Sequence, residues 1–383
     1  YSMTLSDTLY ILGKNASIDV AGDYALYEQD GVGGNRVIIR GSVIGSENAL
    51  DAAIGLEGKN SEVWIAKTGL VHAFTGIQMG AYEQQVTNYG KIDATGFGIW
   101  AQSNGTVRNF GLISGDDNGF ISGGVHSVDV FNGKAGRIVS DNVAVHIQGG
   151  TDTTSTLTNE GMINGRGARA FSSSWGDETV VNHGVMKGLI SMGAGNDLFD
   201  NRGGKVDHAI YGEAGDDTLI TNSAKVHLQE DAGMGSDTVR STVSYTLTAN
   251  VETLVLLGKA DLNGSGNDIA NTLTGNKGDN RLQGLAGFDI LNGASGNDIL
   301  TGGADADVFV FAKRGGHDVI TDFTGGLDYI DLKGQTVIDD YYDMINNYVR
   351  QSHGDLTIHM GKDTLTLQDT TLADLDVKDF FFS

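Results

Sequence analysis

The sequence of 383 residues contains no cysteine and no proline. Without cysteine there is no disulfide framework and no thiolate metal site, so an exported chain would need another kind of cross-link. Without proline, the 57 glycines fit neither a collagen triple helix nor a Pro/Gly linker. This glycine content favours many tight turns between short strands.

Basic residues and long apolar runs are also scarce. The chain has 25 Lys and Arg against 49 Asp and Glu, a net charge of -24, whereas a nucleic-acid-binding protein has the opposite balance. No apolar run approaches the ~20 residues of a membrane span. The first residues, Tyr1-Ser2-Met3, include no signal-like segment, and we interpret the chain as a fragment. The acidic excess serves either solubility or cation binding, and the positions of the acids decide between the two.

A seven-residue unit recurs through the first half of the chain, with an apolar residue, Asn, Gly and a second apolar residue at alternate positions. Its clearest copies are Val86–Ile92, Val107–Ile113, Leu157–Ile163 and Val180–Met186. A copy stretched by two residues, Val130–Ile138, lies between the second and third of these, and the interval from one copy to the next is then about the length of one β-helix coil. The apolar positions would then stack inside, and the Asn side chains would form a ladder at one corner. A β-sandwich with Asn-x-Gly hairpins is the alternative, but sandwich strands do not repeat such a signature.

A nine-residue repeat follows, in the pattern G-G-x-G-x-D-x-U-x, where U is a large apolar residue. Its tandem copies begin at Gly275, Gly284, Gly293 and Gly302. This is the known nonapeptide of calcium-binding parallel β-helices. Six residues form a turn whose carbonyl groups and aspartate supply part of a calcium shell, and the last three form a short strand. Because calcium takes six to eight oxygen ligands, the ion must lie between stacked turns.

Two nonapeptides make one coil, so we expect partners two repeats apart, Asp289 with Asp307 and Asn280 with Asp298. Single copies of the same turn occur earlier, around Asp197, Asp217 and Asp237, at equal intervals that each correspond to a whole coil. These three aspartates predict one calcium row along a single edge. Another single copy contains Asp268 and leads into the tandem array.

The candidate calcium ligands are the sixth-position residues and, through their carbonyl groups, the turn glycines. They are Asp197, Asp217, Asp237, Asp268, Asn280, Asp289, Asp298, Asp307, Gly195, Gly215, Gly235, Gly284, Gly287, Gly293, Gly296 and Gly302. Each aspartate alone could form an Asx-turn without metal, but eight copies in phase favour several calcium ions. Asn280 is neutral and Asp305 replaces the usual glycine, which makes these two turns atypical.

On these motifs, residues 191–383 resemble the repeats-in-toxin (RTX, hemolysin-type) calcium-binding proteins exported by type I secretion. They are similar to the C-terminal β-roll domain of serralysin-type proteases. Segments 318–323 and 326–332 match the closing segment of that family, which implies that Asp318 and Asp322 complete the last calcium sites. The end of the chain, Val377–Ser383, is similar to the family's export signal. It could equally be a final strand that covers the open end of the solenoid.

We therefore expect an all-β parallel β-helix or β-roll solenoid with a C-terminal cap. The expected segments are a β-helix at 1–186, rungs with one calcium loop per coil at 187–262, a tandem β-roll at 263–312, and the cap with the secretion signal at 313–383. The chain has no HExxH, GxSxG, P-loop or Rossmann motif, so we expect no enzyme.

The leading functional prediction is a secreted, extracellular or cell-surface-associated protein with a structural or adhesive role, which folds on calcium after export. Its expected partners are calcium, the type I secretion machinery, and either itself or an extracellular polysaccharide. Two alternatives stay open. One is the export module of a larger toxin or adhesin. The other is a polysaccharide lyase or epimerase that uses residues of the central rungs, namely His126, His146, Arg166, Arg169 and His183.

Overall fold

The structure is a computed structural model that describes residues 3–5, 9–20, 24–28, 33–48, 51–124, 126–311 and 313–382. The chain forms two compact units, residues 1–217 and 218–383. Each is built from short strands that pair in parallel with strands of the preceding and following coils. The expected all-β parallel solenoid is confirmed, and the β-sandwich alternative is wrong.

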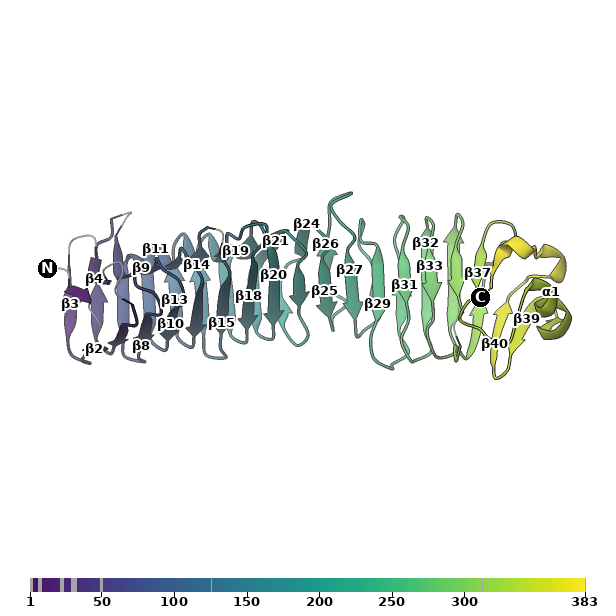
Figure 1. The fold of residues 1–383 in the computed structure, drawn as a ribbon, viewed down its shortest axis with the longest axis horizontal. Coiled ribbons are helices and arrows are strands. Elements are labelled where there is room, and N and C mark those ends of the chain that lie inside the picture. Colours follow the sequence, from purple (N-terminus) through teal and green to yellow (C-terminus); the bar gives the residue numbers. More distant parts are fainter. Residues whose placement is uncertain are drawn as a thin grey trace. The chain divides into compact units, whose positions relative to one another are not determined.

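In the first unit, each coil contributes strands to two parallel sheets (Figure 1). One sheet contains β2 (Leu9–Leu12), β5 (Arg36–Ile39), β8 (Glu62–Ile65), β10 (Gln84–Asn88), β12 (Gly105–Asn109), β15 (Val128–Asn132), β18 (Thr154–Asn159), β20 (Asp177–Asn182) and β22 (Leu198–Asp200). The other contains β1 (Met3–Leu5), β3 (Ser17–Asp19), β4 (Tyr24–Glu28), β6 (Ser42–Ile44), β7 (Ala52–Leu56), β9 (Leu70–Met79), β11 (Lys91–Ala101), β13 (Leu112–Gly115), β14 (Asn118–Ser122), β16 (Arg137–Ser140), β17 (Val143–Ile147), β19 (Met162–Ser173), β21 (Val185–Ala194), β23 (Lys205–Val206) and β24 (Ile210–Ala214).

The apolar positions of the seven-residue unit stack inside this unit as expected. One column in register, with every side chain at most 1% exposed, consists of Val37, Val63, Val86, Val107, Val130, Leu157, Val180 and Phe199. Each coil thus buries one large apolar side chain per strand against its neighbours, which stabilises the fold by about 1.5–3 kcal/mol per side chain.

The Asn residues of the unit form the expected ladder at the corner. Side-chain amide groups donate to the next Asn side chain over 2.7–2.8 Å along Asn88, Asn109, Asn132, Asn159, Asn182 and Asn201. All six side chains are buried. In several coils the Oδ1 atom also accepts a local backbone bond, as in Gly90 N–H to Asn88 at 3.0 Å. The ladder therefore satisfies a row of polar groups that would be costly to bury alone.

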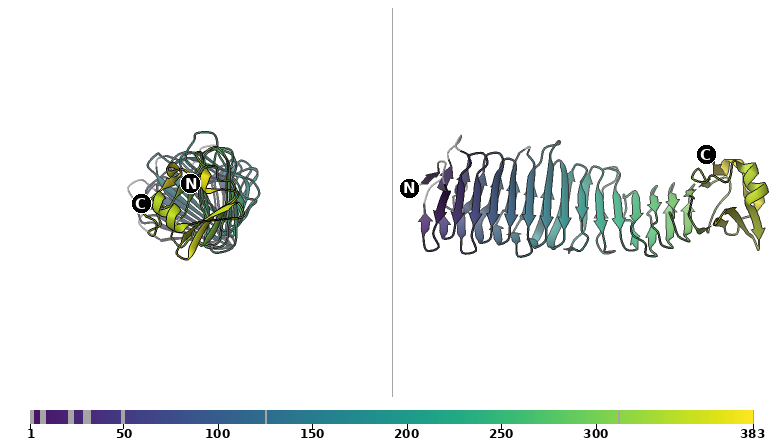
Figure 2. Two further views of the ribbon diagram at one scale, coloured as in Figure 1. Left: turned by 90° about the vertical axis from the view of Figure 1, so that its right-hand side faces the viewer. Right: turned by 60° about the horizontal axis from the view of Figure 1, so that its bottom comes forward.

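In the second unit, the strands again alternate between two sheets (Figure 2). One contains β25 (Thr218–Thr221), β27 (Thr238–Ser241), β29 (Thr253–Leu256), β31 (Thr272–Thr274), β33 (Ile290–Asn292), β35 (Val308–Val310), β37 (Tyr329–Asp331) and β41 (Phe380–Phe381). The other contains β28 (Tyr245–Thr246), β30 (Asn263–Ser265), β32 (Arg281–Ala286), β34 (Ile299–Ala304), β36 (His317–Ile320), β40 (Asp363–Leu367), β39 (Asp355–Met360) and β38 (Val349–Ser352), and a short β26 (Leu228–Gln229) lies outside both.

The last segment closes this unit. Strands β38, β39 and β40 form an antiparallel meander, and β40 pairs in parallel with β36. Short helical turns lie beside it: α1 (Tyr341–Asp343), η1 (Met344–Tyr348), η2 (Leu372–Asp374) and η3 (Val377–Asp379). Ile330 of β37 pairs with Phe380 of β41, so the apolar tail is the final strand of its sheet. Among the described residues, no helix is both long and apolar enough to cross a membrane.

Candidate metal centre

The sixth-position residues of the nonapeptides stand in two columns in the second unit. The strand registers place each column residue one coil from the next, at the expected interval of two nonapeptides in the tandem region. One column is Asn271, Asp289, Asp307 and Asp328, and the other is Asn280, Asp298 and Asp318. Every member is at most 4% exposed, so these columns bury many carboxylates.

Backbone hydrogen bonds connect the members of each column. The N–H of Asp289 donates to Oδ1 of Asp307 at 3.0 Å, and Asp289 itself accepts from Asn271 N–H at 2.8 Å. In the other column, Asp298 accepts from Asn280 N–H at 2.7 Å and donates to Asp318 at 2.9 Å. The Oδ1 atom of each aspartate thus accepts a hydrogen bond from the backbone N–H of the column residue one coil before it.

The second carboxylate oxygen is left without such a bond at several positions. Oδ2 of Asp289 and Oδ2 of Asp298 are buried and accept no hydrogen bond from the described residues. A buried carboxylate oxygen without a partner carries the full cost of lost hydration. A hard divalent cation would supply what these oxygens lack, because calcium prefers oxygen ligands and carboxylates above all.

Burial raises the pKa of these carboxyls. It raises the pKa of Asp289 to about 7, with the charges of Asp307 and Asp305 adding to the effect. Burial also raises the pKa of Asp298 to about 6 and that of Asp318 to about 7. Stacked carboxylates therefore oppose their own ionisation near neutral pH. A bound cation would reverse that balance, since metal binding requires the deprotonated ligand.

The turn glycines have two distinct roles. At the first position of the repeat, a Cβ on Gly284, Gly293 or Gly302 would lie 2.2 Å from Oδ2 of the aspartate in the same turn. These glycines therefore leave space for the carboxylate. At the fourth position, glycine adopts a left-handed backbone that other residues avoid, at Gly195 (φ 143°), Gly215 (127°), Gly287 (104°) and Gly296 (131°).

Two of the expected residues do not fit this pattern. Asp268 is exposed and lies outside the column, and Asn271 occupies the position instead. The correct register was available from the sequence, because Asn271 precedes Asn280 by one nonapeptide. Gly235 lies on an exposed loop in which Gly233, with φ 74°, provides the left-handed turn.

Asn280 is placed in its column as expected, but its amide is satisfied by the protein. Its Oδ1 accepts from Asn276 N–H at 2.7 Å, and its Nδ2 donates to Leu262 O at 3.2 Å. Asn271 is held in the same way, with Nδ2 donating to Val251 O at 3.0 Å. In these two asparagines the Nδ2 amide stands where an aspartate has its Oδ2 atom, so this position donates hydrogen bonds and cannot bind a cation. The pairs of aspartates are thus better cation sites than the coils with asparagine.

The closing segment differs from expectation in part. Asp318 joins a column, as predicted, but Asp322 does not. The Asp322 carboxylate accepts from Gly302 N–H at 3.0 Å and Gly303 N–H at 2.9 Å. The residue beyond Asp307 in the column is Asp328, whose Oδ1 accepts from Asp307 N–H at 3.0 Å. It lies in segment 326–332, which resembles the family's closing segment, but its position could not be obtained by counting repeats because the tandem array has ended.

The earlier single turns also form a column. Asp197 N–H donates to Oδ1 of Asp217 at 2.8 Å, as predicted from their spacing of one coil. The register Thr218 to Thr238, between β25 and β27, sets Asp237 one coil after Asp217. Asp237 N–H donates in turn to Oε2 of Glu252 at 2.8 Å, so a glutamate continues this series.

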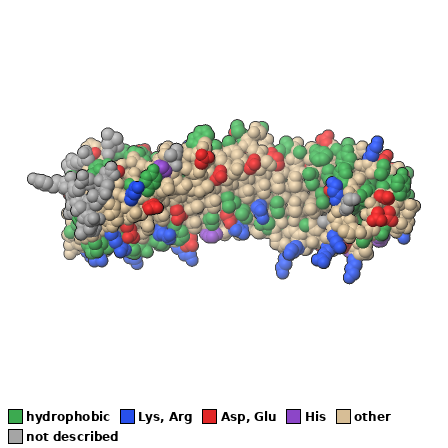
Figure 3. Space-filling model, viewed as in Figure 1, with side chains coloured by type: hydrophobic (Ala, Val, Ile, Leu, Met, Phe, Trp, Pro, Cys, Tyr) green, Lys and Arg blue, Asp and Glu red, His purple; other side chains and the backbone are tan. Residues whose placement is uncertain are grey.

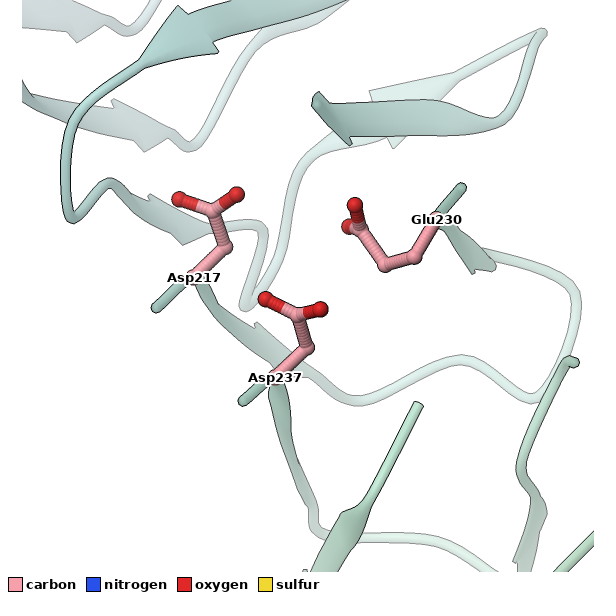
Figure 4. A group of neighbouring side chains, drawn as sticks. All are labelled: Asp217, Glu230 and Asp237. Carbon is pink, nitrogen blue, oxygen red and sulfur yellow. The ribbon is translucent and has the colours of Figure 1, made fainter. Parts of the chain in front are cut away.

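A third carboxylate, which the sequence pattern does not reveal, lies beside two members of this series. Asp217, Glu230 and Asp237 are all buried, and one carboxylate oxygen from each lies within 4.8 Å of the others (Figure 4). The three groups point toward a common space in this view. Glu230 follows the short β26 and belongs to no nonapeptide, so spacing alone could not have identified it.

Part of the excess of acidic residues is therefore buried inside the solenoid rather than exposed on its surface. On the face shown in Figure 3, Asp and Glu side chains lie in small separate groups rather than in one continuous patch. The buried columns hold carboxylates such as Asp289 and Asp298, whose Oδ2 atoms accept no hydrogen bond from the described residues. The donor set is hard oxygen only, it is repeated coil by coil, and it fits calcium.

The residues proposed for a polysaccharide-active site make different kinds of contact. His126 packs edge-on against Tyr82, with ring centroids 5.2 Å apart, whereas Arg166 forms an ion pair with Asp141 at 2.6 Å. The Nδ1 atom of His146 is buried, and burial, with the charge of Arg169, lowers the pKa of this imidazole. Arg169 N–H donates to Asn142 O at 2.9 Å, next to Asp141, and β17 pairs with β19, so the Arg166 and His146 contacts lie on neighbouring coils.

A comparison with known protein families agrees with this geometry. The family model "RTX calcium-binding nonapeptide repeat (4 copies)" matches residues 209–223, 263–287 and 274–309. No curated protein matches the chain. A similar solved structure is extracellular lipase LipA from Serratia marcescens, with 15% sequence identity and a TM-score of 0.28. The match covers 73% of this chain and 40% of the lipase, so the chain spans less than half of that protein's length. On its stacked turns and the family match together, the chain carries RTX calcium-binding nonapeptide repeats.

Proposed function

We propose that this is a secreted, non-catalytic protein with a structural or adhesive role, whose solenoid folds when calcium binds outside the cell. The observation that carries the proposal is the column of buried aspartates with an oxygen that no protein group satisfies among the described residues, as at Asp289 and Asp298. Without cations, these groups oppose folding. With cations, they become cross-links between coils in a chain that has no disulfides.

The concentration of calcium then acts as the folding signal. Extracellular calcium modules bind at ~10⁻⁴–10⁻³ M, well above the calcium level of the cytosol. A cation that binds only the folded state stabilises it increasingly as its free concentration rises. The chain would therefore stay unfolded during export through a type I pathway and form its coils outside.

Circular dichroism and electron microscopy with and without calcium test this proposal. We expect a β-type spectrum and ordered assemblies with calcium, and loss of both in chelator. A full β spectrum that persists in chelator would contradict calcium-dependent folding. Calcium-folded protein that stays monomeric and binds no polysaccharide would contradict the structural or adhesive role.

A polysaccharide-modifying activity is the second candidate, and one feature of the first unit supports it. A groove of about 510 Å³ crosses successive coils, and most residues that line it carry a hydroxyl, amide or carboxylate group that can bind sugar hydroxyls. Its lining includes Asn60, Gln85, Asn104, Thr106, Asp129 and Thr156. Incubation with alginate and pectin, followed by absorbance of the unsaturated product, tests for a lyase. Binding without product would favour the adhesive role.

A further inference from the structure

A turn of the first unit that lies before the recognised repeats has the same construction as the nonapeptide turns. It comprises Gly176, Asp177 and Glu178, where the nonapeptide would have glycine, any residue and aspartate. The family match begins only at residue 209. The register Thr179 to Leu198, between β20 and β22, places Glu178 one coil before Asp197. Glu178 therefore stands in the column that continues through Asp197 and Asp217.

Two hydrogen-bond series indicate that this turn is equivalent to the others. In the first, Glu178 N–H donates to Asp197 Oδ1 at 2.5 Å, just as Asp197 N–H donates to Asp217. In the second, Asn196 N–H donates to Asp177 Oδ1 at 2.8 Å. The tandem region repeats that bond between Asn297 and Asp279 at 2.7 Å.

The glycines of this turn also stack as they do in the nonapeptides. Gly176 has φ 99°, and a Cβ on Gly195 would lie 1.9 Å from the carbonyl oxygen of Gly176. One coil later, a Cβ on Gly215 would lie 1.8 Å from the carbonyl oxygen of Gly195. The carbonyl groups of successive turns thus approach closely at this corner in both coils.

The side chains of this turn have the features of an incomplete ligand set. Glu178 is 1% exposed and Asp197 is 3% exposed. Glu178 Oε2 accepts a hydrogen bond from Ser173 Oγ, but its Oε1 accepts none from the described residues. Oδ2 of Asp197 is likewise buried and accepts none from them. Two buried carboxylates on adjacent coils each retain an oxygen without a donor.

We infer that Glu178 and Asp197 form a calcium site one coil before the recognised nonapeptides, with glutamate in place of the usual aspartate. The inference rests on the proposed calcium binding, and it extends the cation row into a segment that no repeat pattern identifies. Glutamate retains the charge and both oxygens of aspartate, so the change lengthens the ligand arm without altering its chemistry. The remaining ligands would be backbone carbonyl groups and water.

Trp175 makes this site separately measurable. It is 55% exposed, precedes Glu178 closely in the chain, and forms a bridge with Ala194 of the next coil. Terbium occupies calcium sites, and an indole close to the ion sensitises its emission. We expect terbium emission on tryptophan excitation in the wild type, and its loss in both Glu178→Gln and Trp175→Phe.

Calorimetric calcium titrations of the whole chain measure the number of calcium ions bound. We expect Glu178→Gln to bind one ion fewer than the wild type, whereas Trp175→Phe and the matched charge control Glu160→Gln bind the full number. Glu178→Asp, which has the usual nonapeptide residue, is expected to retain the ion. This variant keeps the inference testable if Glu178→Gln does not fold.

The outcomes separate this inference from the proposed function. If Glu178→Gln binds as many ions as the wild type and retains the terbium emission, Glu178 is only a buried structural acid and the inference is wrong. In that case the calcium sites of the tandem repeats are unaffected. If the wild-type protein binds no calcium at all, the proposed function fails with it.

Discussion

Replacing Asp289 by asparagine should have opposite effects on stability in the absence and in the presence of calcium. Asp289 is fully buried, its Oδ1 accepts from Asn271, and its Oδ2 has no donor among the described residues. Asparagine has nearly the same shape and can retain the first bond. It removes a buried charge when calcium is absent and a calcium ligand when calcium is present.

The size of each effect follows from the structure. Burial raises the pKa of Asp289 to about 7 from 3.8, and at ~1.4 kcal/mol per pKa unit the charge costs at most ~4.5 kcal/mol above neutral pH. Because the effective dielectric constant of a protein interior exceeds that of a dry medium, we expect about half of this cost, so asparagine should stabilise the calcium-free fold by ~2 kcal/mol. In about 10 mM calcium, each site of extracellular affinity contributes ~1.4–2.7 kcal/mol, which the variant loses where Asp289 is a ligand.

Urea unfolding at pH ~8, followed by circular dichroism, measures both quantities. The calcium-free arm is run in chelator with enough trimethylamine oxide to populate the folded state. Asp268→Asn is the matched control, because it removes the same charge from an exposed residue outside the column and should change stability little. Equal destabilisation of Asp289→Asn in both arms would refute the reasoning, since the side chain would then act only through packing.

Three further outcomes are expected. Calcium affinity should fall as the pH is lowered from ~8 to ~5, because the carboxyls of Asp289 and Asp318, with pKa raised to about 7, must lose protons to bind, and calorimetry at several pH values measures this. For the same reason the calcium-free fold should gain stability as the pH falls from about 7 toward 3.8, because the folded state then binds more protons than the unfolded chain. A loss of stability in that pH range would contradict the raised pKa values. Asn132→Ala should cost ~2–4 kcal/mol with or without calcium, because it leaves buried ladder partners unsatisfied, whereas Asn142→Ala at an exposed site should cost little. Leu291→Ala, at a fully buried core position, should cost ~2–5 kcal/mol in calcium, and an unchanged urea midpoint would argue against the strand register described here.

Periodicity made the fold and most of the site predictable. The spacing of Val86, Val107, Leu157 and Val180 predicted a coil of variable length, and these residues do stack in register. The spacing of Asp289 and Asp307, two repeats apart, predicted their adjacency. Such features are accessible because a solenoid converts sequence distance directly into spatial position.

The ligand predictions were incomplete where sequence distance does not determine spatial position. Asp268 has the right local neighbours, but it lies just before the column position, which asparagine fills. Glu178 and Glu230 differ from the expected residue type, and Glu230 lies outside any repeat. Asp328 lies past the end of the tandem array, where the coil becomes longer than two nonapeptides. In each case tertiary contacts, rather than local sequence, decide which acid is buried.

The alternation of successive nonapeptides between two sheets restricts how this array can change in length. Leu273, Leu291 and Phe309 belong to one sheet, whereas Leu282 and Leu300 belong to the other. Loss or duplication of a pair of nonapeptides would leave every later strand on its own sheet and keep both aspartate rows aligned. A change by a single nonapeptide would exchange the two sheets and bring the closing meander to the wrong edge. Recombination between copies of the repeat should therefore be tolerated in whole coils and eliminated in halves.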